Sequence, residues 1–98
     1  MKALFITYSQ AYNEEIVRIL ELFGQKGFTR WTDVEGRGSN DGLPHMGSHA
    51  WPEMNHALII FVEDGEKAEE ILQALRRADE RSPKLGLRAF MWNVEKYY

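Results

Sequence analysis

Cysteine is absent from this 98-residue chain. Disulfides, thiolate metal sites, iron–sulfur clusters and cysteine nucleophiles are therefore excluded. Positive charge is also scarce, because 12 Lys and Arg face 15 Asp and Glu, which gives a formal net charge of −3. A general nucleic-acid binder needs a basic footprint to neutralise phosphates, so we expect no nucleic-acid partner.

Long apolar runs are missing as well. The longest, Ala3–Ile6 and Ala57–Val62, have the length of a strand and are far too short to span a membrane. The first seven residues lack the apolar core and cleavage site of a signal peptide. We therefore expect a cytoplasmic protein without membrane insertion, folded as one domain over residues 1–98.

The residues that are present predict four strands. Lys2–Tyr8, Phe28–Val34, His56–Val62 and Leu87–Val94 are rich in bulky, β-branched and aromatic side chains. The strands at 2–8 and 56–62 carry apolar residues at successive positions, so both of their faces are apolar. The sheet therefore needs a cover on each side.

Two segments have the periodicity of amphipathic helices. We expect Asn13 to cap the first and Asp64 to cap the second, each followed by acidic residues that a helix N-terminus favours. Each segment then carries one apolar stripe, which is Ile16, Ile19, Leu20 and Phe23 in the first and Ala68, Ile71, Leu72, Leu75 and Ala78 in the second.

The element order is strand, helix, strand, strand, helix, strand. It predicts an α+β, ferredoxin-like βαββαβ fold, with a four-stranded antiparallel sheet whose first and third strands are central and with both helices on one face. No segment remains to cover the second face. A further copy of the chain is the simplest cover, and Trp31 and Trp92 are expected in packing or subunit contacts.

A long connection, Glu35–Asn55, separates the second and third strands. Hairpin connections usually take about two to five residues, and longer loops in compact domains are commonly functional. This segment holds four of the eight glycines, two of the three prolines, two of the three histidines and Trp51. Its Gly36-Arg37-Gly38 run could hold an anion on backbone amides, or could simply let the strand leave the sheet.

These features together resemble the nitrogen-regulatory PII-like superfamily, which is related in architecture to CutA. The resemblance covers nearly the whole chain. It rests on the element order, on Gly27-Phe28 leading into Val34–Gly38, on the long loop and on the ending Gly86–Val94. The loop, with its G-x-G, P-x-x-G and W-P-x-x-N patterns, is similar to that of a short-loop PII-like subgroup.

The resemblance implies a non-enzymatic signalling protein that forms a homotrimer. Its effector, often an adenine nucleotide, would bind at an intersubunit cleft and reshape the loop, which then contacts a transporter or an enzyme. Gly36, Arg37, Gly38 and Arg88 match the effector-binding positions. The matching loop positions for the partner are Pro44, Gly47, Trp51, Pro52 and Asn55.

The histidines leave a second interpretation open. His45, His49 and His56 lie within twelve residues, with Met46 and Met54 nearby. Imidazole with thioether suits copper, and imidazole with carboxylate suits zinc or nickel. The alternative function is therefore a metal-binding or metal-tolerance accessory protein, unless the three histidines are unrelated. The cofactor stays open between an adenine nucleotide and a transition metal.

Two other classes share this fold. RNA-binding domains of this topology use strand aromatics, here Phe5 and Phe61, but the third strand lacks their basic opening. Acylphosphatase-type enzymes need an arginine in the loop after the first strand, and Ser9–Asn13 contains none. No spacing indicates a nucleophile with its base, so we expect no catalysis.

Overall fold

The structure is a computed structural model of the whole chain, and it describes residues 1–36, 46–47, 54–82 and 86–98. The element order is β1 (Lys2–Ser9), η1 (Gln10–Tyr12), α1 (Asn13–Leu22), β2 (Thr29–Val34), β3 (Asn55–Val62), α2 (Gly65–Arg81) and β4 (Arg88–Asn93). The predicted strands and helices are confirmed, with differences of one or two residues at their ends.

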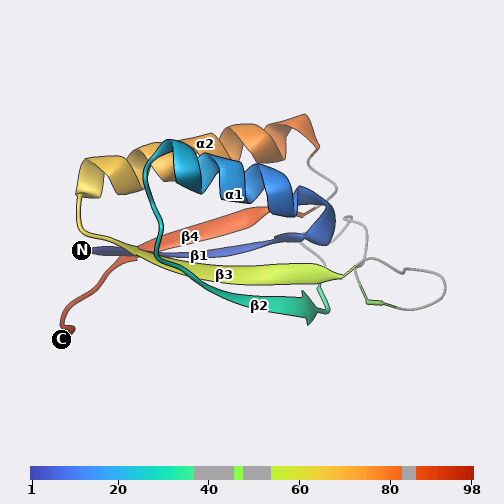
Figure 1. Cartoon of the computed structure of the whole chain (residues 1–98), viewed down its shortest axis with the longest axis horizontal. Helices are drawn as coiled ribbons and strands as arrows, with labels where there is room; N and C mark the ends of the chain where they lie inside the picture. Colours follow the sequence, from blue (N-terminus) through green and yellow to red (C-terminus); the bar gives the residue numbers. More distant parts are fainter. Residues whose placement is uncertain (37–45, 48–53, 83–85) are drawn as a thin grey trace.

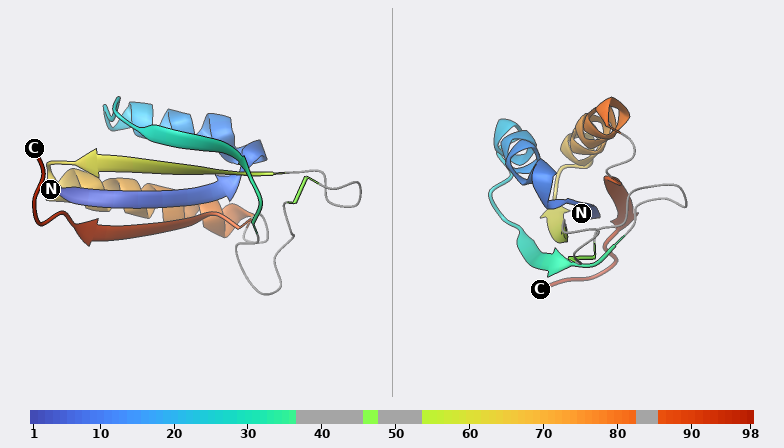
Figure 2. Two further views of the ribbon diagram at one scale, coloured as in Figure 1. Left: turned by 90° about the horizontal axis from the view of Figure 1, so that it is seen from below. Right: turned by 90° about the vertical axis from the view of Figure 1, so that its right-hand side faces the viewer.

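The four strands form one antiparallel sheet in the order β2-β3-β1-β4, so β1 and β3 are central as predicted. Both helices lie on one face of this sheet (Figure 1), and the end-on view in Figure 2 shows the other face without a helix. The domain therefore has two layers. This arrangement confirms the ferredoxin-like fold class.

The core lies between the sheet and the helices. Alternate residues of the central strands, Leu4, Ile6 and Tyr8 on β1 and Leu58 and Ile60 on β3, are completely buried against the helix stripes. The remaining core residues include Ile16, Ile19, Leu20, Val62, Ala68, Ile71, Leu75, Ala78 and Leu87.

The opposite face of the sheet is apolar, and no helix of the described residues covers it. We call it the open face. Its exposed aromatic side chains come from three strands, and Phe5 and Ile59 lie half-buried among them. Their exposed fractions are 49% for Trp31, 50% for Phe61, 58% for Phe90 and 47% for Trp92. The prediction that one helix layer leaves the second face without a cover is confirmed.

The two helices begin differently. Asp64 caps α2 as predicted, because its carboxylate accepts hydrogen bonds from the amides of Glu66 and Lys67 at 2.9 and 3.4 Å. The prediction that Asn13 caps α1 is wrong, because α1 has no side-chain cap and Asn13 lies inside its first turn. A 3-10 turn capped by Ser9 precedes it. The Asn13 side chain accepts instead from Tyr8 and Arg30.

None of the helices in the described ranges combines the length and the apolar composition needed to cross a bilayer.

Candidate functional site

The candidate site lies at one end of the sheet, where β1 and β2 end and where β3 and β4 begin. We call it the loop end. The register pairs Asn55, the first residue of β3, with Ser9 at the end of β1 and with Val34 at the end of β2. Arg88, the first residue of β4, pairs with Thr7 on the other side of β1. β2 and α2 therefore end here, and β3 and β4 begin here (Figure 2).

Gly36 and Asn55, which flank the long loop, pack against each other. A Cβ atom at Gly36 would collide with the Asn55 side-chain nitrogen and would lie 3.3 Å from its Cγ. Only glycine leaves room for this approach, so the residue at 36 is fixed by packing. The sequence placed Gly36 at an effector site and Asn55 at a partner surface, and the structure brings the two together.

Asn55 is a buried polar residue with an unused acceptor. It is 5% exposed, and its Oδ1 has no hydrogen-bond partner among the residues that the structure describes. A buried acceptor without a donor costs roughly 1–3 kcal/mol, so this oxygen favours any donor that reaches the base of the loop.

The far side of the long loop is anchored beside β1. The Gln10 amide donates to the Met54 carbonyl at 2.9 Å, which ties η1 to the chain just before β3. Gly47 has φ +65°, a conformation that favours glycine, and a Cβ there would collide with the Met54 sulfur. The described part of the loop thus returns to its own base.

Arg88 lies at the loop end and already forms an ion pair and a hydrogen bond. Its Nη1 lies 3.2 Å from Oδ2 of Asp79 on α2 and donates to the Leu87 carbonyl at 2.8 Å. The guanidinium remains accessible, since the Arg88 side chain is 38% exposed. A hollow of about 260 Å³ adjoins this pair, lined by Leu72, Gln73, Leu75, Arg76, Asp79, Leu87, Arg88 and Ala89.

His56 makes its contacts with neighbouring strands of the sheet. Its Nδ1 accepts a hydrogen bond from the Asp33 amide at 3.4 Å, at a bulge where Asp33 has φ 56°. Its ring also packs edge-on against Tyr8, with centroids 5.8 Å apart. Within the described residues, no three His, Asp or Glu side chains gather as metal ligands. His45 and His49 lie outside the described residues, and the geometry at His56 gives the metal interpretation no support.

Sequence reasoning missed a polar group beneath the loop end. The buried Tyr8 hydroxyl donates to Asn13 Oδ1 at 3.0 Å, and Arg30 donates to the same oxygen at 2.9 Å. Burial raises the pKa of Tyr8 above its ordinary value of 10.0, and the neighbouring Arg30 opposes part of that rise. Asp79 was missed as well, because its partner is close only in space.

The remaining predicted site residues, Arg37, Gly38, Pro44, Trp51 and Pro52, also lie outside the described residues.

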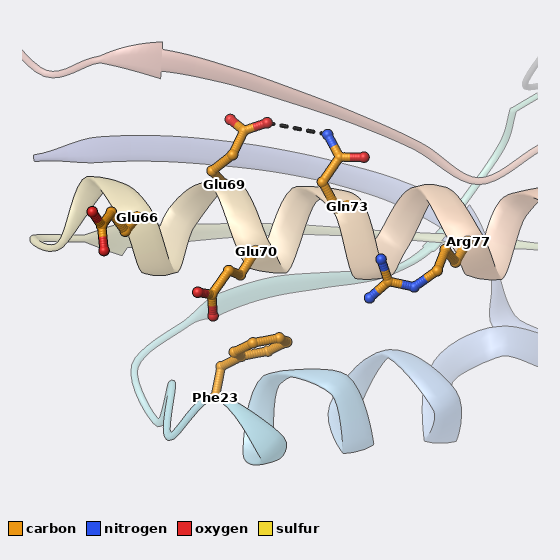
Figure 3. A pocket seen from close by; sticks show the side chains of 6 residues that line it. All are labelled: Phe23, Glu66, Glu69, Glu70, Gln73 and Arg77. Atoms are coloured by element: carbon orange, nitrogen blue, oxygen red, sulfur yellow. Dashed lines mark hydrogen bonds between the residues drawn. The ribbon is translucent and has the colours of Figure 1, made fainter.

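A larger groove lies at the other end of the domain. It measures about 490 Å³ and runs between Phe23, just after α1, and the stretch of α2 from Glu66 to Arg77 (Figure 3). Its α2 side carries Glu66, Glu69, Glu70, Gln73 and Arg77, with Glu69 accepting from Gln73 at 3.1 Å. The groove extends along α2 as far as Arg77, and Gln73 lines both this groove and the hollow beside Arg88.

The fold and the loop end define a class. It is a ferredoxin-like domain with a long β2–β3 connection and a basic residue at the start of β4. A scan of protein-family models and a search of curated protein sequences each found no match.

Solved structures do match. CPII from Thiomonas intermedia K12, bound to ADP and bicarbonate, superposes with a TM-score of 0.74 at 22% identity, over 95% of this chain and 84% of that one. CPII bound to ADP, AMP and bicarbonate gives 0.75 at 21%, over 95% and 84%. A structure from Thermus thermophilus, described as a PII-like signaling protein, gives 0.66 at 27%, over 95% and 85%. The two CPII matches show the fold, and the match at 27% identity supports assignment of the chain to the PII-like superfamily.

Proposed function

We propose that this protein is a non-enzymatic PII-like regulator that binds an anionic effector, an adenine nucleotide such as ADP, at the loop end. One observation carries the proposal. Asn55 and Arg88 lie on either side of β1 at the same end of the sheet, and Gly36 packs against Asn55. Gly36 and Arg88 are the positions that the family resemblance assigns to the effector. The strands β3 and β4 lie about 10 Å apart across β1, a span that a nucleotide can bridge.

The neighbours support this choice of effector. CPII structures contain ADP, AMP and bicarbonate, all of them anions. In this chain Arg88 supplies an accessible guanidinium, the group best suited to bidentate contact with phosphate oxygens. Gly36 has no side chain of its own, so its backbone can approach an effector at the same end of the sheet. The residues beyond it, Arg37 and Gly38, complete the proposed effector group.

The proposed assembly is a homotrimer held together by the open face. Four aromatic side chains there are each about half exposed, on a sheet whose other face is sealed by helices. An exposed apolar surface of this kind marks a contact between proteins. Subunits joined through it would bring a neighbouring chain to the loop end, where the effector then binds in a cleft between chains.

The regulatory output of the proposal is a change in the 36–55 loop. An effector that contacts one loop arrangement better than another shifts the population toward it. Pro44, Gly47, Trp51 and Pro52 would then meet a protein partner, a transporter or an enzyme, in the cytoplasm. Asn55 is buried at the base of the loop, so it is not expected to contact the partner.

Two measurements test the proposal. Native mass spectrometry should report a trimer, and isothermal titration calorimetry with ADP should show binding. Arg88→Gln should weaken ADP binding by about tenfold or more, because a charged hydrogen bond is worth roughly 1.5–3 kcal/mol. Arg18→Gln, the same charge change at an exposed position on α1, should alter it by less than about twofold. A monomer contradicts the assembly, and equal ADP affinity in both variants contradicts the site.

A further inference from the structure

Arg88 already has an anion bound to it in the ligand-free chain. Its Nη1 lies 3.2 Å from the Asp79 carboxylate, and the two side chains are only 38% and 24% exposed. Any effector that uses this guanidinium must therefore compete with Asp79. The competitor belongs to α2, two residues before the helix ends.

The position of Arg88 in the sheet assigns its side chain to the open face, although its guanidinium contacts the helix side. Alternation along β1 places Ile6 and Tyr8 on the helix side, so Thr7 and its partner Arg88 belong to the open face. The guanidinium nevertheless reaches α2, which covers the helix side. Because β4 is an edge strand, the side chain can reach α2 around the edge of the sheet.

The Asp79 carboxylate is only half satisfied in this pair. Its Oδ2 accepts from Arg88, whereas its Oδ1 is buried and without a hydrogen-bond partner in the part of the chain described here. A buried carboxylate oxygen without a donor weakens the pair, because it lost water and gained no bond in return. The ion pair with Asp79 is therefore weak enough for another anion to compete for Arg88.

The backbone connects this pair to the base of the long loop. The Ser82 amide donates to the Asp79 carbonyl, and the Ser82 carbonyl accepts from the Tyr12 hydroxyl, both at 3.0 Å. Tyr12 ends η1, whose first residue, Gln10, donates to Met54 at the loop base. The end of α2 that carries Asp79 is thus fixed to the segment that anchors the loop.

We infer that Asp79 is a resident counterion that holds Arg88 on the α2 side, and that an anionic effector binds by drawing Arg88 away from it. This inference rests on the proposed function, since it concerns the same guanidinium. Asp79 is then a positioning residue that sets the effector affinity. Its carboxylate makes binding weaker than the free guanidinium would allow, so that only a ligand with several anionic oxygens displaces it.

The first experiment examines the pair without ligand. NMR of isotope-labelled arginine in the full chain measures how fast the Arg88 guanidinium protons exchange with water. Exchange should be slowed in the parent protein and faster in Asp79→Asn. Glu80→Gln is the matched control, because it removes one charge from the adjacent position, where Glu80 pairs with Arg76 on the helix surface. Equal exchange in all three proteins would show that no pair forms, whatever ADP does.

The second experiment measures ADP binding by calorimetry. Asp79→Asn should bind ADP about twofold to fivefold more tightly, the range expected for release from a partly exposed ion pair. Glu80→Gln should match the parent. In an Arg88→Gln background the gain from Asp79→Asn should disappear, because no guanidinium remains to be released. A substitution that merely damaged the fold would weaken binding, which is the opposite sign.

The outcomes separate the two proposals. Weaker or unchanged ADP binding in Asp79→Asn, together with loss in Arg88→Gln, overturns the counterion and leaves the effector site standing. Binding that is equal in the parent, in Asp79→Asn and in Arg88→Gln overturns both. ADP binding that appears only in Asp79→Asn supports the counterion and shows that Asp79 blocks the nucleotide in the isolated protein.

Discussion

The two faces of the sheet are made by the same strands and differ in what covers them. On the helix side, Leu4, Ile6, Leu58 and Ile60 are completely buried. On the open face, the neighbouring residues Phe61 and Phe90 are half exposed or more. Both faces are apolar in sequence, yet the single chain seals only one. An apolar face that its own chain leaves open indicates a surface that another molecule completes.

The comparison separates two kinds of stability. Contacts on the helix side form within one chain, so their contribution does not depend on protein concentration. Contacts through the open face would form between chains and would stabilise the fold by mass action, so that their contribution falls on dilution. Concentration dependence therefore distinguishes the two faces experimentally.

The largest effect is expected on the helix side. Leu58→Ala should lower the free energy of unfolding by about 2–5 kcal/mol, because it leaves a cavity in a fully buried position. Urea denaturation at several protein concentrations measures it. The loss should be the same at each concentration. A loss that shrinks on dilution would mean that this face, too, depends on another chain.

The next effect belongs to the open face. Phe90→Ser should weaken association by roughly 1.5–3 kcal/mol per subunit, the value of burying one large apolar side chain. Sedimentation velocity over a dilution series measures the assembly. Circular dichroism should show an unchanged fold, since Phe90 is 58% exposed in the single chain. An unaltered assembly would remove the open face as the subunit contact.

A smaller effect is expected at the loop end. Gly36→Ala should destabilise the protein by about 1–3 kcal/mol, because the new methyl group collides with the Asn55 side chain. Gly65→Ala is the control, since a Cβ there meets nothing within 4 Å at the start of α2. Thermal unfolding compares the two. The packing described between Gly36 and Asn55 does not exist if both variants melt alike.

The smallest effect concerns pH and the buried Tyr8. Its pKa is raised in the folded protein, mainly by burial, so the folded state holds this proton more tightly than the unfolded one. The resulting stabilisation is complete below about pH 10, and it is lost as the pH rises through the raised pKa. Stability measured between neutral and strongly alkaline pH should therefore fall less steeply in Tyr8→Phe. An identical pH dependence in Tyr8→Phe and the parent protein would mean that a group other than Tyr8 causes the loss of stability.

The elements of this fold could be predicted because their signals are local. The short apolar runs of β1 and β3, the apolar stripes of both helices and the Asp64 cap each depend on residues a few positions apart. Asn13 shows the limit of such reasoning. Its residue type and position suit a helix cap, but Tyr8 and Arg30 reach its side chain from two strands, and this competition is visible only when the strands are in place.

The candidate site could be predicted only in part. The family resemblance points to Gly36, Asn55 and Arg88, but it does not show that Gly36 touches Asn55 or that Arg88 pairs with Asp79. The Asp79 signal was weak in sequence, being one acidic residue among several near the end of a charged helix. A contact between residues nine positions apart on different elements depends on how the chain turns between them.

The strands, the helices and the sheet face without a helix cover can all be predicted from local patterns, because periodicity and apolar content act over short distances. The tertiary structure decided which groups meet at the loop end. Strand register brings Asn55 and Arg88 to either side of β1, and the return of α2 over the sheet supplies Asp79. Such pairings follow from packing in three dimensions, which one-dimensional patterns do not encode.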